Sequence, residues 1–231
     1  AQEKNIMPGA PMRFVTDNAT GKVEMQETDV SPFTLFKRPI PGHSYMISID
    51  PITASSGETD MFIMSVWDTA NNEQVAIFAD RGLQDEDYAD WAVSMGTIYN
   101  KAILCPEINV ANGFIVSCNA RRYYRWWYLN RKAQADRTPG LRTTVSSKEK
   151  MLDMLSAMLD RQTIIIHDEK TLDELRNFVK IAKTRQDGSQ YVRMAAKSGH
   201  RDDRVASLWI YAGTRSLREI EGRKKSSFAI I

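Results

Sequence analysis

The sequence lacks any hydrophobic run long enough to span a membrane, which needs about 20 consecutive apolar residues. Four of its first five residues are polar, and this start lacks the arrangement of charged and apolar regions of a secretory signal peptide. We therefore expect no membrane partner and a cytoplasmic location.

Cysteine is also scarce. The two cysteines, Cys105 and Cys118, form no CxxC pair and supply no zinc-ligand spacing. Two free thiols in a reducing compartment are more typical of such a chain than a disulfide. A site built from cysteine and histidine is therefore not expected.

The chain has little excess charge of either sign. Its 31 basic and 29 acidic residues leave a net charge of +2. Any surface that binds nucleic acid must therefore come from local clustering of cations, not from the overall charge. With 231 residues, 42% of them hydrophobic, the chain is long enough to bury the core of a globular domain.

Proline is unevenly distributed. Residues 1–43 contain five of the eight prolines, and we interpret them as a proline-rich N-terminal arm or interdomain linker. This arm has one expected hairpin, formed by residues 13–15 and 22–26. Residues 44–222 form the main domain, and residues 223–231 form a C-terminal tail.

Hydrophobic periodicity predicts regular structure throughout the main domain. The expected strands are residues 45–49, 61–67, 74–79, 102–105, 123–129 and 163–167. The expected helices are residues 85–99, 109–119, 146–160 (capped by Ser146 or Ser147), 171–182 and 204–217. The first three strands predict an antiparallel meander, and the wholly apolar run 102–105 is typical of a buried parallel strand. The fold class is therefore α/β: a mixed sheet of three antiparallel strands plus parallel strands, flanked by helices on both faces.

Acidic residues occupy the positions that this layout brings together. Asp50 ends the first strand, and Asp60 opens the second. Glu107 follows the apolar strand, at the carboxyl edge where open α/β sheets place their ligands. Asp202 and Asp203 begin the last helix. A single acid at such a position is more typical of a turn or a helix cap, so the combination carries the inference.

Carboxylates held close together repel one another and need a counter-charge. Magnesium or manganese ions fit this requirement, because both are hard cations that prefer oxygen ligands. Two such ions can activate a water molecule and stabilise the leaving oxygen of a phosphodiester. The predicted chemistry is two-metal hydrolysis of a phosphodiester, without a covalent intermediate.

The order of these motifs resembles the RNase H-like nuclease domain of the large terminase subunit of tailed bacteriophages or prophages. The resemblance spans roughly residues 35–220. The matching segments are 41–51 (PGHSYMISIDP), 57–60 (GETD), 107–109 (EIN) with 112–113 (NG), 140–144 (GLRTT) and 199–205 (GHRDDRV).

The resemblance implies an RNase H-like fold and an endonuclease that cuts double-stranded DNA during viral genome packaging. It implies that Asp50, Glu107 and Asp203 are the catalytic metal ligands, with Asp60 as an accessory acid.

The family commonly has histidine followed at once by two aspartates, whereas Arg201 separates His200 from the pair here. Asp202 is therefore an alternative ligand to Asp203. His200 is expected to be an accessory residue that orients the metal site or the scissile phosphate.

A complete large terminase also has an ATPase motor with a Gly-x-x-x-x-Gly-Lys-Ser/Thr phosphate loop, and this sequence has none. We interpret the chain as a C-terminal nuclease fragment of a protein that carries the motor; the alternative is a motor on another chain. The further partners that the resemblance implies are double-stranded DNA, the phage portal and the small terminase subunit. The implied location is the cytoplasm of the bacterial host.

A basic and aromatic strip occupies residues 119–132. Its arginines are expected to contact DNA phosphates, although a core strand with solvated edges is an equally simple interpretation. The full set of expected DNA contacts is Arg121, Arg122, Arg125, Lys148, Arg201 and Arg204.

Two alternative functions remain open from the sequence. One is another RNase H-like nuclease, such as a Holliday-junction resolvase or a transposase core. The other is a non-catalytic module that binds DNA or docks on the portal and whose acids only cap helices.

Overall fold

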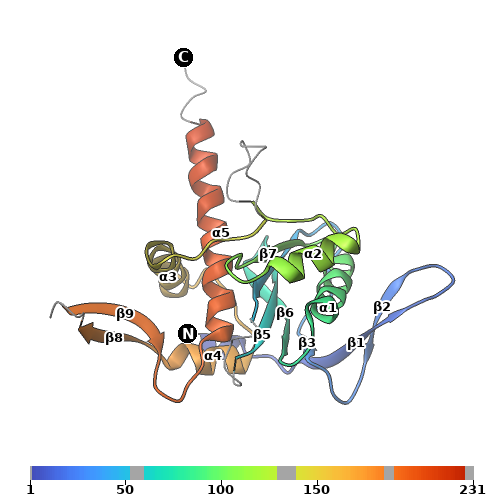
Figure 1. The fold of residues 1–231 in the computed structure, drawn as a ribbon, viewed down its shortest axis with the longest axis horizontal. Coiled ribbons are helices and arrows are strands. Elements are labelled where there is room, and N and C mark those ends of the chain that lie inside the picture. The colour runs from blue at the N-terminus through green and yellow to red at the C-terminus, as the bar shows by residue number, and fades with distance from the viewer. Residues whose placement is uncertain (1, 53–59, 129–138, 185–189, 227–231) are drawn as a thin grey trace.

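The computed structural model of the chain describes residues 2–52, 60–128, 139–184 and 190–226. Its centre is a seven-stranded mixed sheet in the order β2-β1-β3-β6-β5-β4-β7, shown in Figure 1. The strands are β1 (Ala10–Thr16), β2 (Val23–Glu27), β3 (Phe33–Leu35), β4 (Tyr45–Asp50), β5 (Phe62–Asp68), β6 (Glu73–Asp80) and β7 (Ile103–Pro106). A separate hairpin consists of β8 (Phe178–Thr184) and β9 (Gln190–Ala196).

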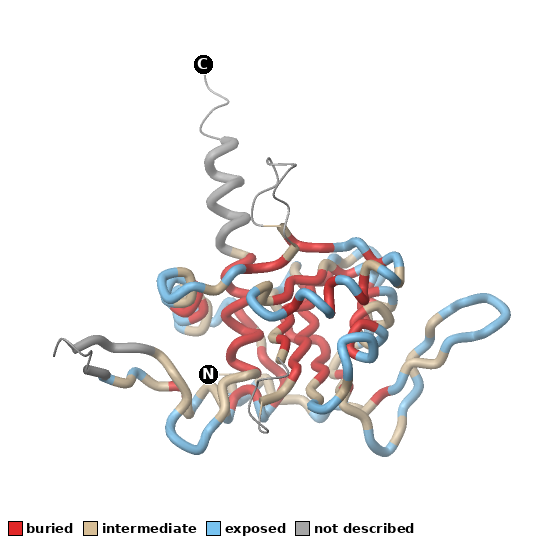
Figure 2. Tube along the Cα trace, in the orientation of Figure 1, coloured by how far each residue is buried: buried red, intermediate tan, exposed pale blue. Residues whose placement is uncertain are grey.

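The helices cover both faces of the sheet, as expected. They are the short 3-10 helix η1 (Gln2–Asn5), α1 (Asp85–Ile98), α2 (Asn112–Ala120), α3 (Val145–Asp160), α4 (Glu169–Arg176) and α5 (Asp203–Ser226). Ile47 and Ile49 of β4 pack into one hydrophobic cluster with α1 and α2. Met46 packs into the other cluster with α3 and α5. The alternation predicted for this strand therefore divides its side chains between two cores, and Figure 2 shows the buried residues concentrated there.

The central meander and the parallel strand are confirmed. β4 pairs antiparallel with β5, and β5 pairs antiparallel with β6. β7 lies parallel to β4, with Ile49 opposite Pro106. Every residue of β5 is buried, because this strand is covered by helices on both faces. Because β7 runs parallel to β4, the carboxyl ends of these two strands meet at one edge of the sheet.

Residues 2–43, interpreted from the sequence as part of a proline-rich arm or interdomain linker, contribute three strands to the fold. The expected hairpin is present as β1 and β2. β1 also pairs with β3, and β3 pairs with β6, so this stretch extends the central sheet. Met12, Phe33 and Leu35 are buried in the core. Whether a further domain precedes the stretch stays a prediction.

Three other expected elements differ. Residues 123–129 and 163–167 were expected to be strands, but their described parts form only isolated bridges, through Trp126, Tyr128 and Ile165. The expected helix 171–182 ends at Arg176, and the chain continues as β8. The cap of α3 is Thr144, whose side chain accepts a hydrogen bond from Ser147 N, in place of Ser146 or Ser147. Across the described ranges, no helix is both long enough and apolar enough to cross a membrane.

Candidate metal centre

Asp50 and Glu107 lie side by side at the carboxyl edge of the sheet. Asp50 is the last residue of β4, and Glu107 follows β7 directly. The Glu107 backbone N–H donates to the Ile49 carbonyl at 3.0 Å, which continues the parallel register by one residue. The two carboxylates therefore come from adjacent strand ends, as the sequence predicted.

Asp203 reaches the same edge from the start of α5. Its Oδ2 accepts a hydrogen bond of 3.2 Å from the Met61 backbone N–H, just before β5. One turn further along α5, Ser207 Oγ lies 2.9 Å from Ser65 Oγ of β5. These two contacts fix the N-terminal turns of α5 on the sheet, so the position of Asp203 is set by the fold.

Electrostatic coupling shows that the predicted acids are close together. Burial raises the pKa of Asp50 well above its usual value, and the neighbouring charges of Glu107, Asp203 and Asp202 raise it further. Lys148 acts in the opposite direction. A half-buried carboxylate surrounded by other carboxylates holds its proton more tightly because its ionised form is poorly solvated and repelled.

Asp203 experiences the same effects. Burial raises its pKa to about 6, against the hydrogen bond from Met61 N–H. Asp60 and Asp202 raise the pKa further, and Arg201 lowers it. All five predicted acids therefore belong to one electrostatically coupled set.

This set matches a divalent cation in the chemistry of its donors. The donors are all carboxylate oxygens, the ligand type that magnesium and manganese prefer, and their mutual repulsion is relieved by a cation. Within the described ranges, however, no three acidic, histidine or cysteine side chains are grouped closely enough to hold an ion. The acids converge without forming a closed ligand cage.

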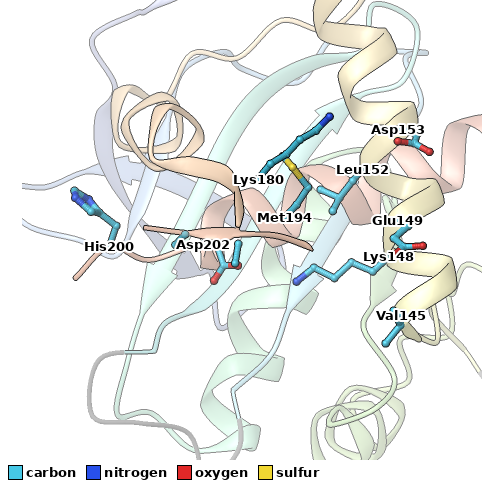
Figure 3. A pocket seen from close by; sticks show the side chains of 11 residues that line it. Val145, Lys148, Glu149, Leu152, Asp153, Lys180, Met194, His200 and Asp202 are labelled. Carbon is cyan, nitrogen blue, oxygen red and sulfur yellow. The ribbon is translucent and has the colours of Figure 1, made fainter. Parts of the chain in front are cut away.

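A cavity of about 740 Å³ opens beside the acids, between α3, the β8–β9 hairpin and residues 200–202. Figure 3 shows Lys148 pointing from α3 toward Asp202, whereas the imidazole of His200 points away from Lys148. Lys180 of β8 also lines the cavity. Of these two lysines, Lys148 has its ammonium directed toward Asp202, whereas the Lys180 ammonium points away from it (Figure 3).

Sequence reasoning missed the role of Asn109. Its side-chain amide donates to Glu107 Oε1 at 3.1 Å and to the Thr143 carbonyl at 2.7 Å. The amide therefore links Glu107 to the segment that precedes α3 and restrains its rotamer. Proximity in sequence was the available signal, since an amide two residues after an acid can reach its carboxylate.

The predicted DNA contacts fall into separate places. Arg121 pairs with Asp90 of α1 through both carboxylate oxygens. Arg125 donates its Nε–H to the Lys101 carbonyl, at the end of β7 opposite Glu107. Tyr123, Trp126 and Trp127 are buried, whereas Tyr124 is exposed. The aromatic residues of this strip are thus mainly core, and Arg122 and Arg125 remain exposed.

Arg204 needs correction as a DNA contact. Its side chain is buried, with Nη1 2.7 Å from Asp168 Oδ2 and Nε 3.5 Å from Glu174 Oε1. The backbone N–H of Arg204 also donates to Glu174 at 2.8 Å. This guanidinium joins the start of α5 to α4 and is already paired with two carboxylates.

The mixed sheet with helices on both faces belongs to the RNase H-like class of folds. The structure is similar to the large terminase nuclease from the thermophilic phage G20c. The TM-score is 0.62 at 20% sequence identity, and the match covers 79% of this chain and 88% of that chain.

Two further solved structures give similar values. The magnesium-bound form of the G20c nuclease has a TM-score of 0.63 at 20% identity, covering 80% of this chain and 88% of that one. The large terminase nuclease domain of Thermus phage P74-26 has a TM-score of 0.60 at 21% identity, covering 79% and 85%. No family model and no curated protein sequence matches the chain. At this level of identity the likeness establishes the shared fold.

Proposed function

We propose that this chain is a metal-dependent endonuclease that cleaves double-stranded DNA during viral genome packaging. The observation that carries the proposal is the convergence of Asp50, Glu107 and Asp203 at one edge of an RNase H-like sheet, where burial and the charges of Glu107 and Asp203 raise the pKa of Asp50. Such crowding of carboxylates is typical of a site for divalent cations.

Each acid has a distinct part in the proposed site. Asp50, Glu107 and Asp203 hold two magnesium or manganese ions, and Asp60 and Asp202 add charge beside them. When bound, these ions supply Lewis acidity toward the attacking water and the leaving oxygen of the phosphodiester. The Asn109 amide and the Met61 N–H orient Glu107 and Asp203.

The cationic side chains complete the proposed site. Lys148 projects toward the acids from α3, where its ammonium can pair with a phosphate oxygen of the DNA backbone. His200 and Arg201 lie on the segment that leads into Asp202 and are proposed as outer contacts to the same strand. Since phosphate contacts carry no base information, cleavage is expected to be independent of sequence.

The wider setting follows from the fold neighbours, which are nucleases of large terminases. We propose that the chain works as the nuclease part of a protein with an ATPase motor. Its proposed partners include the phage portal and the small terminase subunit, in the cytoplasm of a bacterial host.

Nicking of supercoiled plasmid tests the proposal. Millimolar magnesium or manganese is expected to support cutting. Calcium is expected to bind without supporting it, because its larger and looser coordination shell positions an attacking water poorly. Cutting that survives exhaustive EDTA treatment would refute the metal mechanism, and no cutting with any ion would favour a non-catalytic module. Selective cutting of four-way junctions over linear duplex would indicate a resolvase.

A further inference from the structure

The side chain of Lys148 lies over the face of Trp209. Its Nζ is 4.0 Å from the centroid of the indole ring, within the distance at which a cation is attracted by the negative face of an aromatic ring. Lys148 comes from α3, and Trp209 comes from α5. The contact therefore joins the cation of one helix to the helix that begins with Asp203.

Packing fixes the position of the Trp209 side chain. Its side chain is only 4% exposed, and its ring centroid is 6.0 Å from that of Phe178. The helix that carries it is anchored to β5 by the Ser207–Ser65 hydroxyl pair. One turn beyond Trp209, a Cβ on Gly213 would lie 2.7 Å from Met151 of α3, so the two helices are in close contact here.

The indole N–H of Trp209 does not account for the choice of tryptophan at this position. Within the described part of the chain, its Nε1–H is buried and has no hydrogen-bond partner. Burying an unsatisfied N–H is unfavourable, and a phenylalanine would avoid that cost. An indole at this position is better explained by its ring face, which attracts cations more strongly than the other aromatic rings.

The position of the Lys148 ammonium, in contrast, is not fixed by its own side chain. Its four-carbon stem is flexible, and it makes no ion pair within 4.0 Å among the described residues. Its ammonium nevertheless lowers the pKa of Asp50, against the larger effect of burial, and it points toward Asp202 (Figure 3). The face of Trp209 is the contact that holds this cation beside the acids.

We propose that Trp209 is a positioning residue, whose ring face holds the Lys148 ammonium at the carboxylate site for contact with a DNA phosphate. The inference rests on the proposed nuclease function for the identity of the ligand. The contact between the two side chains stands independently of it.

The first test reads the contact without any activity. Reductive methylation with labelled formaldehyde places ¹³C-methyl groups on lysines and preserves their charge, and Lys148→Arg identifies the Lys148 signal. Because the methyl groups lie over an aromatic face, we expect an upfield shift caused by the ring current. Trp209→Leu is expected to remove the shift, whereas Trp91→Leu, on the opposite face of the sheet, is expected to leave it. A Lys148 signal that is the same in wild type and Trp209→Leu would overturn the proposal.

The second test is a double-mutant cycle on plasmid nicking with manganese. Trp209→Leu is expected to lower kcat about tenfold, the rate equivalent of a cation–π contact in a partly desolvated site. Trp209→Phe is expected to restore much of the rate, and it serves in place of the leucine variant if that one does not fold. In a Lys148→Ala background, Trp209→Leu is expected to have no further effect.

Equal loss in both backgrounds would mean that Trp209 acts only through the core, and would overturn the proposal. If wild type shows no metal-dependent nicking at all, the proposed function fails. The ring-current measurement then still decides whether Trp209 holds Lys148.

Discussion

The imidazole Nε2 of His167 lies 2.8 Å from the carboxylate Oε1 of Glu73, and both side chains are buried. The other ring nitrogen, Nδ1, faces the carbonyl oxygen of Asn5. Each ring nitrogen of His167 therefore faces an acceptor oxygen. Lys37 also pairs with Glu73, so one buried carboxylate joins the N-terminal segment to the central sheet.

His167→Ala is therefore expected to lower the stability. Loss of the buried contacts to Glu73 and Asn5 should cost about 2–3 kcal/mol, and Lys37 still pairs with Glu73 in this variant. This corresponds to a fall in Tm of ~5–10 °C for a chain of this size. Thermal melting checks it, with the exposed His200→Ala as the matched control. Equal Tm values for the two variants would contradict the role given to His167.

Replacing a candidate ligand should separate activity from folding. Asp50→Asn or Glu107→Gln is expected to lower metal-dependent nicking by at least about a hundredfold, since each removes a charged metal ligand. The Tm without metal should stay equal or rise, because one of several repelling charges is gone. Glu149→Gln, on α3 beside the same cavity, is the control and should cut normally. Near-normal nicking by folded Asp50→Asn would refute the assignment.

The raised pKa of Asp203 predicts how stability depends on pH. The folded state keeps the proton up to about pH 6, whereas the unfolded chain loses it near pH 4. The folded state thus binds more protons in this window, so the metal-free protein loses stability as pH rises from 4 to 6. Asp50, whose pKa is also raised, acts in the same direction.

A divalent ion competes with these protons, so it should stabilise the protein more at pH 7 than at pH 5. Melting curves from pH 4.5 to 7.5, with EDTA or with manganese, measure both effects. Asp203→Asn should flatten the metal-free curve. Parallel pH curves for wild type and Asp203→Asn would show that Asp203 does not titrate as expected.

Gly140 packs closely against Pro106, the residue that precedes Glu107. Its φ is +102°, and an added Cβ would lie 2.3 Å from the carbonyl oxygen of Pro106, next to Glu107. Gly140→Ala is expected to cost about 2–4 kcal/mol, from the left-handed backbone and the displaced neighbour, and to reduce nicking by moving Glu107.

Gly42→Ala is the matched control for this substitution. Gly42 has a φ of +81° but no atom near its missing Cβ, so it carries the backbone cost alone, about 1–2 kcal/mol. Denaturant unfolding measures both variants. Equal losses for the two would mean that the contact with Pro106 adds nothing.

The strand ends that carry Asp50 and Glu107 were predictable from local pattern. Alternation in residues 45–49 and the wholly apolar run 102–105 are signals that a single strand carries in itself. The parallel pairing is in keeping with the rule that parallel strands, covered on both faces, have continuous apolar sequences, and β7 lies beside β4 at the end of the sheet. The backbone positions of these two candidate ligands could therefore be predicted from the sequence, and their role in metal binding stays a prediction.

What the sequence did not show depends on contacts between distant residues. The guanidinium of Arg204 is neutralised by Asp168 and Glu174, and no local pattern separates such an arginine from one that faces DNA. The indole of Trp209 meets a lysine that lies 61 positions earlier (209 minus 148). These contacts exist only once the helices are packed.

The β8–β9 hairpin was missed for a different reason. The hairpin extends from the body of the protein (Figure 1), so little burial imposes a period on its sequence. The sequence pattern of residues 178–182 therefore fits the end of an amphipathic helix as well as it fits a strand. The sequence contains an Asp-Gly dipeptide at positions 187–188, a pair that favours a hairpin over a continuous helix, and this was the available signal.

The pairing of β3 with β6 has a practical consequence for aggregation. A fragment that began at residue 44 would expose the hydrogen-bonding edge of β6, a strand whose first six residues are buried in the intact chain. It would also uncover the apolar surface that Phe33 and Leu35 now protect. Open, apolar strand edges pair with other chains, so a fragment without residues 2–43 is expected to aggregate through the edge that β3 covers in the intact chain.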